Sequence, residues 1–85
     1  LTESRAICSY LEALSPEPNL MGRDAFERAF IEMWDRRMEL LFSMPLMMWV
    51  RHGNPVLAAV ERNQNAEVAS YNQGQAMRMA TWLNE

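Results

Sequence analysis

Residues 24–52 read DAFERAFIEMWDRRMELLFSMPLMMWVRH and carry the start and stop signals of one long helix. Asp24 can cap the N-terminus, and Glu27 three residues later completes a capping box. At the far end two basic side chains complement the helix dipole, Gly53 can adopt the left-handed stop conformation, and Pro55 cannot continue the helix. The stretch therefore predicts a helix of about 28 residues, about 42 Å long at about 1.5 Å per residue.

Apolar residues cover well over half of the circumference of this predicted helix. A helix packed against a single layer needs an apolar arc of only about 100°, so we expect this one to contact two neighbours. Arg37 lies near the centre of the apolar arc, where it either forms a structural ion pair or serves a cleft or subunit interface. Pro45 lies inside the helix, removes a backbone hydrogen bond and predicts a kink near Leu41.

Shorter elements flank the long helix. Residues 1–14 have helical spacing, with Thr2 as the expected N-cap. Residues 15–23 contain two prolines and form a linker. Asn54 can cap a brief helical turn, and an amphipathic helix is expected from about residue 66 to the end, antiparallel to the long helix. Gly74 either weakens that helix or allows close approach of the long one.

Composition excludes several classes of function. The net charge is −3 and there is no basic stripe, which argues against nucleic-acid binding. The longest uncharged apolar run, residues 44–50, is too short to span a membrane. A single cysteine, Cys8, excludes an internal disulfide and fits a reducing cytoplasm. It is expected to be a small core residue, with a reactive thiol as the alternative. His52 is the sole histidine, so neither a histidine-based metal site nor a Ser-His-Asp triad is expected.

The proportion of hydrophobic residues is high for so short a chain. It reaches 49% in 85 residues, with eight methionines and three tryptophans. A chain of this length buries only a modest fraction of its surface. We therefore expect the sequence to be a piece of a larger protein.

Three segments together resemble bacterial glutathione S-transferases. They are LTESRAICSYLE at 1–12, PEPNLMGRD at 16–24 and ERAFIEMWDRR at 27–37. The resemblance implies that residues 1–14 are the last helix of a thioredoxin-like N-terminal domain and 15–23 the interdomain linker. Residues 24–85 are then the first part of an all-α C-terminal domain. By itself, the chain is expected to be all-α: a short helix, a long kinked helix and an antiparallel partner helix.

The resemblance gives Glu3 and Ser4 a chemical role. Without it, an acid and a serine at the start of a helix complement the dipole and cap the first turn. In the family, the matching pair holds the γ-glutamyl end of glutathione, which carries an ammonium and a carboxylate. A helix N-terminus with a serine hydroxyl suits the carboxylate, and an adjacent glutamate suits the ammonium.

Further roles are implied for the long helix. Its inner face lines the pocket for the electrophile, with Met44, Met48 and Val50 as candidates, although core packing is the simpler interpretation for each one. Arg37 and Glu39 are candidates for the interface of a homodimer. The resemblance implies a cytoplasmic enzyme that conjugates glutathione, its co-substrate, to hydrophobic electrophiles without a metal.

The residue that activates the glutathione thiol lies upstream of Leu1 in the family. No catalytic residue is therefore expected in this chain, and the chain alone should be inactive. A rival interpretation is a non-enzymatic relative that serves as a dimerisation or protein-interaction scaffold. A cofactor bundle with methionine and histidine ligands has little support, since methionine at helical spacing is normally core. The sequence does not specify the electrophile, the class of transferase or the activating residue.

Overall fold

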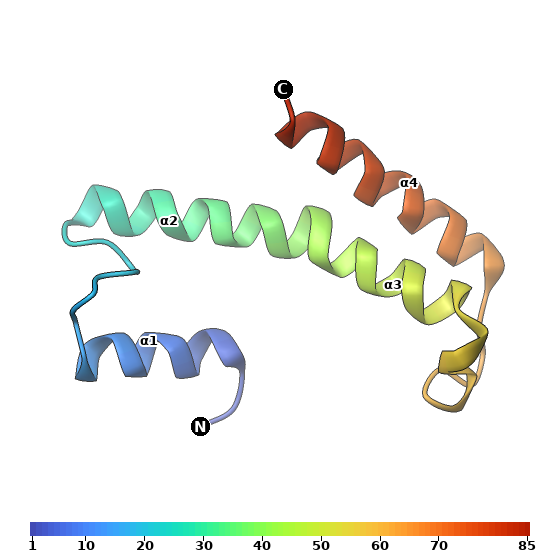
Figure 1. Cartoon of the computed structure of the whole chain (residues 1–85), viewed down its shortest axis with the longest axis horizontal. Helices are drawn as coiled ribbons and strands as arrows, with labels where there is room; N and C mark the ends of the chain where they lie inside the picture. Colours follow the sequence, from blue (N-terminus) through green and yellow to red (C-terminus); the bar gives the residue numbers. More distant parts are fainter. The chain divides into compact units, whose positions relative to one another are not determined.

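A computed structural model describes all of residues 1–85, and every regular element in it is helical, as predicted (Figure 1). The contacts group the chain into two compact units, Leu1–Asp35 and Arg36–Glu85, which are described separately. The predicted division into 1–14, 15–23 and 24–85 stays a prediction. The elements are α1 (Ser4–Leu14), α2 (Ala25–Met38), the π-helix η1 (Glu39–Ser43), α3 (Met44–Gly53), the 3₁₀ helix η2 (Pro55–Ala59) and α4 (Ala66–Leu83).

The start of α2 follows the predicted capping pattern. Asp24 Oδ1 accepts a hydrogen bond from the backbone N–H of Glu27 at 2.8 Å, as a capping box requires. The Glu27 carboxylate accepts in return from the backbone N–H of Arg23, also at 2.8 Å, one residue earlier than predicted. Two donors that have no partner inside the helix are thereby satisfied.

The long helix changes its geometry just before Pro45. Residues 39–43 form a π-helical turn, in which the N–H of Met44 donates to the carbonyl of Glu39, five residues back. Proline has no N–H, and its ring clashes with the carbonyl four residues earlier, here that of Leu41. A wider turn accommodates both effects. The distortion predicted near Leu41 thus takes the form of a π-helical turn.

The predicted left-handed stop at Gly53 is wrong. Gly53 is the last residue of α3 and its φ is not positive; Asn54 leaves the helix at φ −101° and ψ 113°. Asn54 Oδ1 accepts from the N–H of Val56 at 3.0 Å, which confirms the predicted cap of η2. Gly53 faces α4, and a Cβ there would make an ordinary contact, 3.4 Å, with the Cβ of Ala69.

The loop before α4 is tied to the end of α3. The Gln64 amide donates to the carbonyls of Arg51 at 2.9 Å and Asn54 at 2.7 Å, so it satisfies backbone acceptors near the end of α3. The N–H of Asn65 donates to Nδ1 of His52 at 3.0 Å, and the Asn65 side chain caps α4. These bonds set the point from which α4 folds back along α3 (Figure 1).

Little of the apolar surface is covered within the chain. Ala69, Ala76 and Met79, all on α4, are the only buried hydrophobic residues. Cys8, expected in a core, is exposed, because α1 buries none of its residues. The predicted surplus of apolar surface is thus found on both units.

Gly22 takes a backbone conformation that other residues avoid. Its φ is +97°, and a Cβ there would lie 2.6 Å from the backbone nitrogen of Arg28. Because the clashing atom belongs to the backbone, relieving the overlap would require the main chain at Arg28 to shift. Gly74 differs, because a Cβ there would meet only the Arg78 guanidinium at 3.6 Å. Close approach of another helix therefore does not explain Gly74.

Gly22→Ala in the intact protein is expected to lower the free energy of unfolding by about 1–3 kcal/mol or more, since strain and overlap add. The matched control, Gly74→Ala, is expected to raise it by up to about 1 kcal/mol. Urea denaturation of both variants measures the two effects. Equal stability of the two variants would contradict this account of Gly22.

The isolated 85-residue chain is expected to self-associate, because large apolar side chains on both units are open to water. Sedimentation velocity over a range of concentrations checks this. A monomer with a sharp, concentration-independent thermal transition would show that the chain covers these surfaces by itself.

Candidate functional site

The tip of α1 differs from the predicted one. Thr2 does not cap the helix; Glu3 is the N-cap residue and Ser4 the first helical residue, with no side-chain hydrogen bond at the cap. Glu3 has φ 65° and ψ 112°, and it is the only non-glycine residue with positive φ. The chain turns at this residue, so Thr2 lies outside the helix. The ψ value lies well away from the left-handed helical region, so the conformation is strained for a residue with a Cβ.

The tip offers hydrogen-bond donors without acceptors in the chain. The first bond at this end joins the N–H of Ile7 to the carbonyl of Glu3 at 3.0 Å. The N–H groups of Ser4, Arg5 and Ala6 are therefore unpaired, at the positive end of the helix dipole. The side chains of Glu3 and Ser4 are exposed and make no hydrogen bond or ion pair within the chain. Such a tip can bind the carboxylate of a ligand through its N–H groups and the Ser4 hydroxyl. The Glu3 carboxylate of the protein lies beside that position.

Arg5, next to Ser4, anchors the tip to α2. Its guanidinium pairs with the carboxylates of Glu32 and Asp35, and its Nε lies 2.6 Å from Asp35 Oδ2. Nε is buried and makes no well-aligned hydrogen bond, so this contact is mainly Coulombic. The carboxylates are almost half exposed, and the pairs therefore fix geometry more than they add stability. The role of Arg5 was not predicted from the sequence. The signal for it is the pair of acidic residues at 32 and 35, which lie three residues apart on one helix face and can pair with the same cation.

One of the three candidates for the electrophile pocket, Val50, lines a cavity. Val50 lines a cavity of about 430 Å³ together with Met47 and Leu57, whereas Met44 and Met48 line neither this cavity nor the groove described next. An α-helical wheel assumes about 3.6 residues per turn, whereas a π turn holds more residues than an α turn. A wheel drawn through residues 39–43 therefore assigns the residues after them to the wrong face of the helix.

The two candidates for a subunit interface have partners within the chain. Glu39 is exposed and forms an ion pair with Arg36 three residues earlier. Arg37 is partly buried and also has an interaction partner. Neither contact tests a role in an interface, which stays a prediction.

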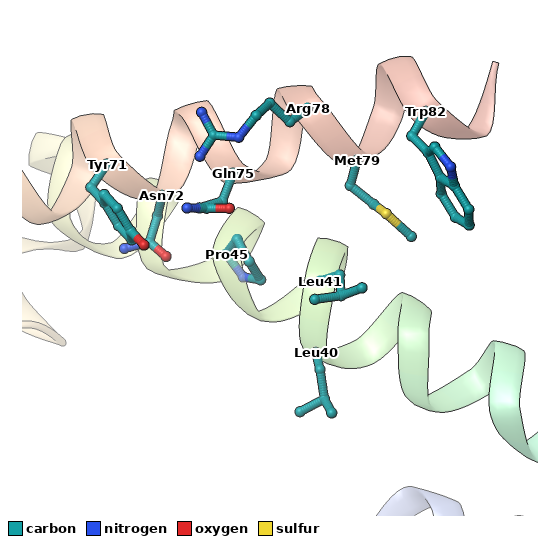
Figure 2. A pocket seen from close by; sticks show the side chains of 9 residues that line it. All are labelled: Leu40, Leu41, Pro45, Tyr71, Asn72, Gln75, Arg78, Met79 and Trp82. Carbon is teal, nitrogen blue, oxygen red and sulfur yellow. The ribbon is translucent and has the colours of Figure 1, made fainter. Parts of the chain in front are cut away.

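A groove of about 380 Å³ lies between α4 and the η1–α3 junction (Figure 2). Gln75 and Met79 extend from α4 toward Pro45 and Leu41, and Trp82 lies beyond them (Figure 2). Sequence reasoning did not select this groove, because its α4 residues form an ordinary helical stripe. Its lining comprises Leu40, Leu41, Pro45, Tyr71, Asn72, Gln75, Arg78, Met79 and Trp82.

Two kinds of feature are absent from the chain. No group of three or more His, Cys, Asp or Glu side chains comes together in a way that could hold a metal ion. None of the helices combines the length and apolar character that crossing a membrane requires.

Comparison with known proteins identifies a relative in yeast. The chain is 35% identical over 68 residues to glutathione S-transferase 2 of Saccharomyces cerevisiae. This similarity supports a relationship to the glutathione S-transferase family. The matched part is 79% of the chain but only 29% of the yeast protein. No protein-family model matches the chain, and no solved structure matches it. Membership of a bacterial branch stays a prediction.

The strain at Glu3 can be measured by comparing Glu3→Gly with Glu3→Ala in the intact protein. At an unstrained N-cap glycine is already better than alanine, because glycine costs a few tenths of a kcal/mol there and alanine about 1 kcal/mol. Glu3→Gly is expected to be more stable than Glu3→Ala by more than this difference, because glycine also relieves the clash of the Cβ. Thermal denaturation provides the comparison, and a difference of about 1 kcal/mol or less would show that the backbone at this residue is unstrained.

Proposed function

We propose that this chain is part of a glutathione transferase and that the tip of α1 holds the γ-glutamyl end of glutathione. The observation that carries the proposal is the strained, uncapped tip at Glu3 and Ser4. Strained residues persist where the structure around them or a function requires them. The similarity to glutathione S-transferase 2 of Saccharomyces cerevisiae supports the proposal independently.

The chemistry of the tip matches both charges of the γ-glutamyl group. The ligand carboxylate accepts hydrogen bonds from the unpaired N–H groups and from the Ser4 hydroxyl, and the helix dipole favours its negative charge. The ligand ammonium pairs with the Glu3 carboxylate. Because Arg5 is already paired with two carboxylates of α2, it fixes the tip and adds no free positive charge to it.

The proposed reaction is attack of the glutathione sulfur on an electrophilic carbon. The thiol loses its proton and a carbon–sulfur bond forms, while the displaced electron pair leaves with a leaving group or is taken up as a multiple bond or strained ring of the electrophile opens. This chain contributes binding and orientation, which lower the barrier by holding the reactants together. Thiol activation is assigned to a residue outside these 85. On this proposal residues 1–14 close a thioredoxin-like domain, 15–23 link the domains and 24–85 begin the all-α domain.

The long helix has the remaining proposed roles. Met44, Met48 and Val50 contribute to the pocket for a hydrophobic electrophile, and Arg37 and Glu39 to the interface of a homodimer in the cytoplasm. Val50 has support from its place in a cavity with an apolar wall. Methionine suits a pocket for varied electrophiles because its side chain adapts to different shapes.

Ser4→Ala in the intact protein is expected to weaken glutathione binding by about 1–3 kcal/mol, the range for a hydrogen bond to a charged group. Isothermal titration calorimetry measures the affinity, and an unchanged melting temperature shows that the fold persists. Ser9→Ala, on the same helix, is the matched control and should bind like the wild type. Unchanged affinity of Ser4→Ala would refute the site. A protein that dimerises but neither binds nor conjugates glutathione would indicate a scaffold.

A further inference from the structure

The segment after the prolines is fastened to α1 by one carboxylate. Oε1 of Glu12, in the last turns of α1, accepts from the backbone N–H of Leu20 at 2.8 Å and of Met21 at 3.1 Å. Two N–H groups that have no partner in regular structure are thereby satisfied. We call this pair of bonds the Glu12 latch.

The turn around the latch is closed by Asn19. Its Oδ1 accepts from the N–H of Gly22 at 3.0 Å, and its Nδ2 approaches the Gly22 carbonyl at 3.3 Å. Nε of Arg28 on α2 also donates to that carbonyl, at 3.4 Å. Residues 19–22 are therefore bonded to α1 on one side and to α2 on the other.

Met21 connects the latch to the tip of α1. Its sulfur accepts a weak hydrogen bond from Nη1 of Arg5 at 3.2 Å, and Arg5 directly follows Ser4. Glu12 holds the backbone of Met21, Met21 contacts Arg5, and Arg5 is paired with α2. A continuous set of polar contacts thus runs from the latch to the residue beside Ser4.

These contacts surround open space. A cavity of about 550 Å³ is lined by Arg5, Glu12, Met21 and Arg28, among others. Dense apolar packing does not hold Met21 in place here, so its position depends on the polar contacts. Loss of the Glu12 carboxylate would leave Met21 room to move away from Arg5.

We propose that Glu12 is a positioning residue for the γ-glutamyl site at Glu3 and Ser4, acting through Met21 and Arg5. This inference rests on the proposed function. Glu12 does not touch the ligand; it keeps Arg5 and the tip in the arrangement that the γ-glutamyl group meets. Without the latch the tip must be ordered at the moment of binding, and this ordering opposes binding.

The test uses Glu12→Ala and Glu12→Gln in the intact protein, with glutathione as the ligand in calorimetry. Glu12→Ala is expected to raise the Kd about three- to tenfold, within the range for ordering one more side chain on binding. Glu12→Gln keeps an oxygen acceptor and should restore the wild-type Kd. Hydrogen exchange of the Leu20 and Met21 amides should accelerate in the alanine variant alone.

Glu17→Ala is the matched control. Glu17 lies in the same segment and forms only an exposed ion pair with Arg23, at 2.8 Å, so its loss should leave the Kd unchanged. If Glu12→Ala does not fold, Glu12→Asp carries the test, because its carboxylate is too short to make both bonds and the Kd should rise.

A double-mutant cycle separates positioning from general stability. If Glu12 acts through the tip, Glu12→Ala should raise the Kd much less in a Ser4→Ala background. Additive effects, or a wild-type Kd for Glu12→Ala, would overturn the inference while leaving the proposed function intact. No effect of Ser4→Ala would overturn the proposed function itself, whatever Glu12 does.

Discussion

The guanidinium of Arg5 between the carboxylates of Glu32 and Asp35 is the interaction on which the first unit depends. α1 buries none of its residues, so apolar packing does not orient it. An arginine can be shared by two carboxylates and still contact a third group, here the sulfur of Met21. One side chain therefore relates α1, the linker and α2, and it does so beside the proposed site.

Much of the fold was predictable, because local signals determine it. The cap at Asp24, the turn at Asn54 and the helix from Ala66 follow from side chains that bond to backbone nearby in sequence. The failures lie where the decisive contact is distant. The residues around Gly53 indicate a stop signal, but α3 ends at Gly53 without a left-handed residue, and the position lies beside Ala69, sixteen residues later.

The candidate site was predictable in its residues but not in its geometry. The segment Glu3-Ser4-Arg5 supports an assignment by resemblance, yet no periodicity indicates a positive φ at a glutamate. The latch of Glu12 on Leu20 and Met21 is equally invisible in a sequence, because it joins a helix to a loop through backbone groups. Side-chain patterns predict which face is apolar; they do not predict where a backbone donor lacks a partner.

The π turn at residues 39–43 has a consequence for how this helix tolerates changes in length. A π turn accommodates one residue more than the same stretch of α-helix. Deleting one residue there would allow an ordinary α turn and leave the residues beyond it on the faces that they now occupy. The same deletion from a stretch of α-helix would rotate everything beyond it by about 100° around the axis. The winding of this turn, as much as the chemistry of its residues, determines which side chains of α3 meet α4.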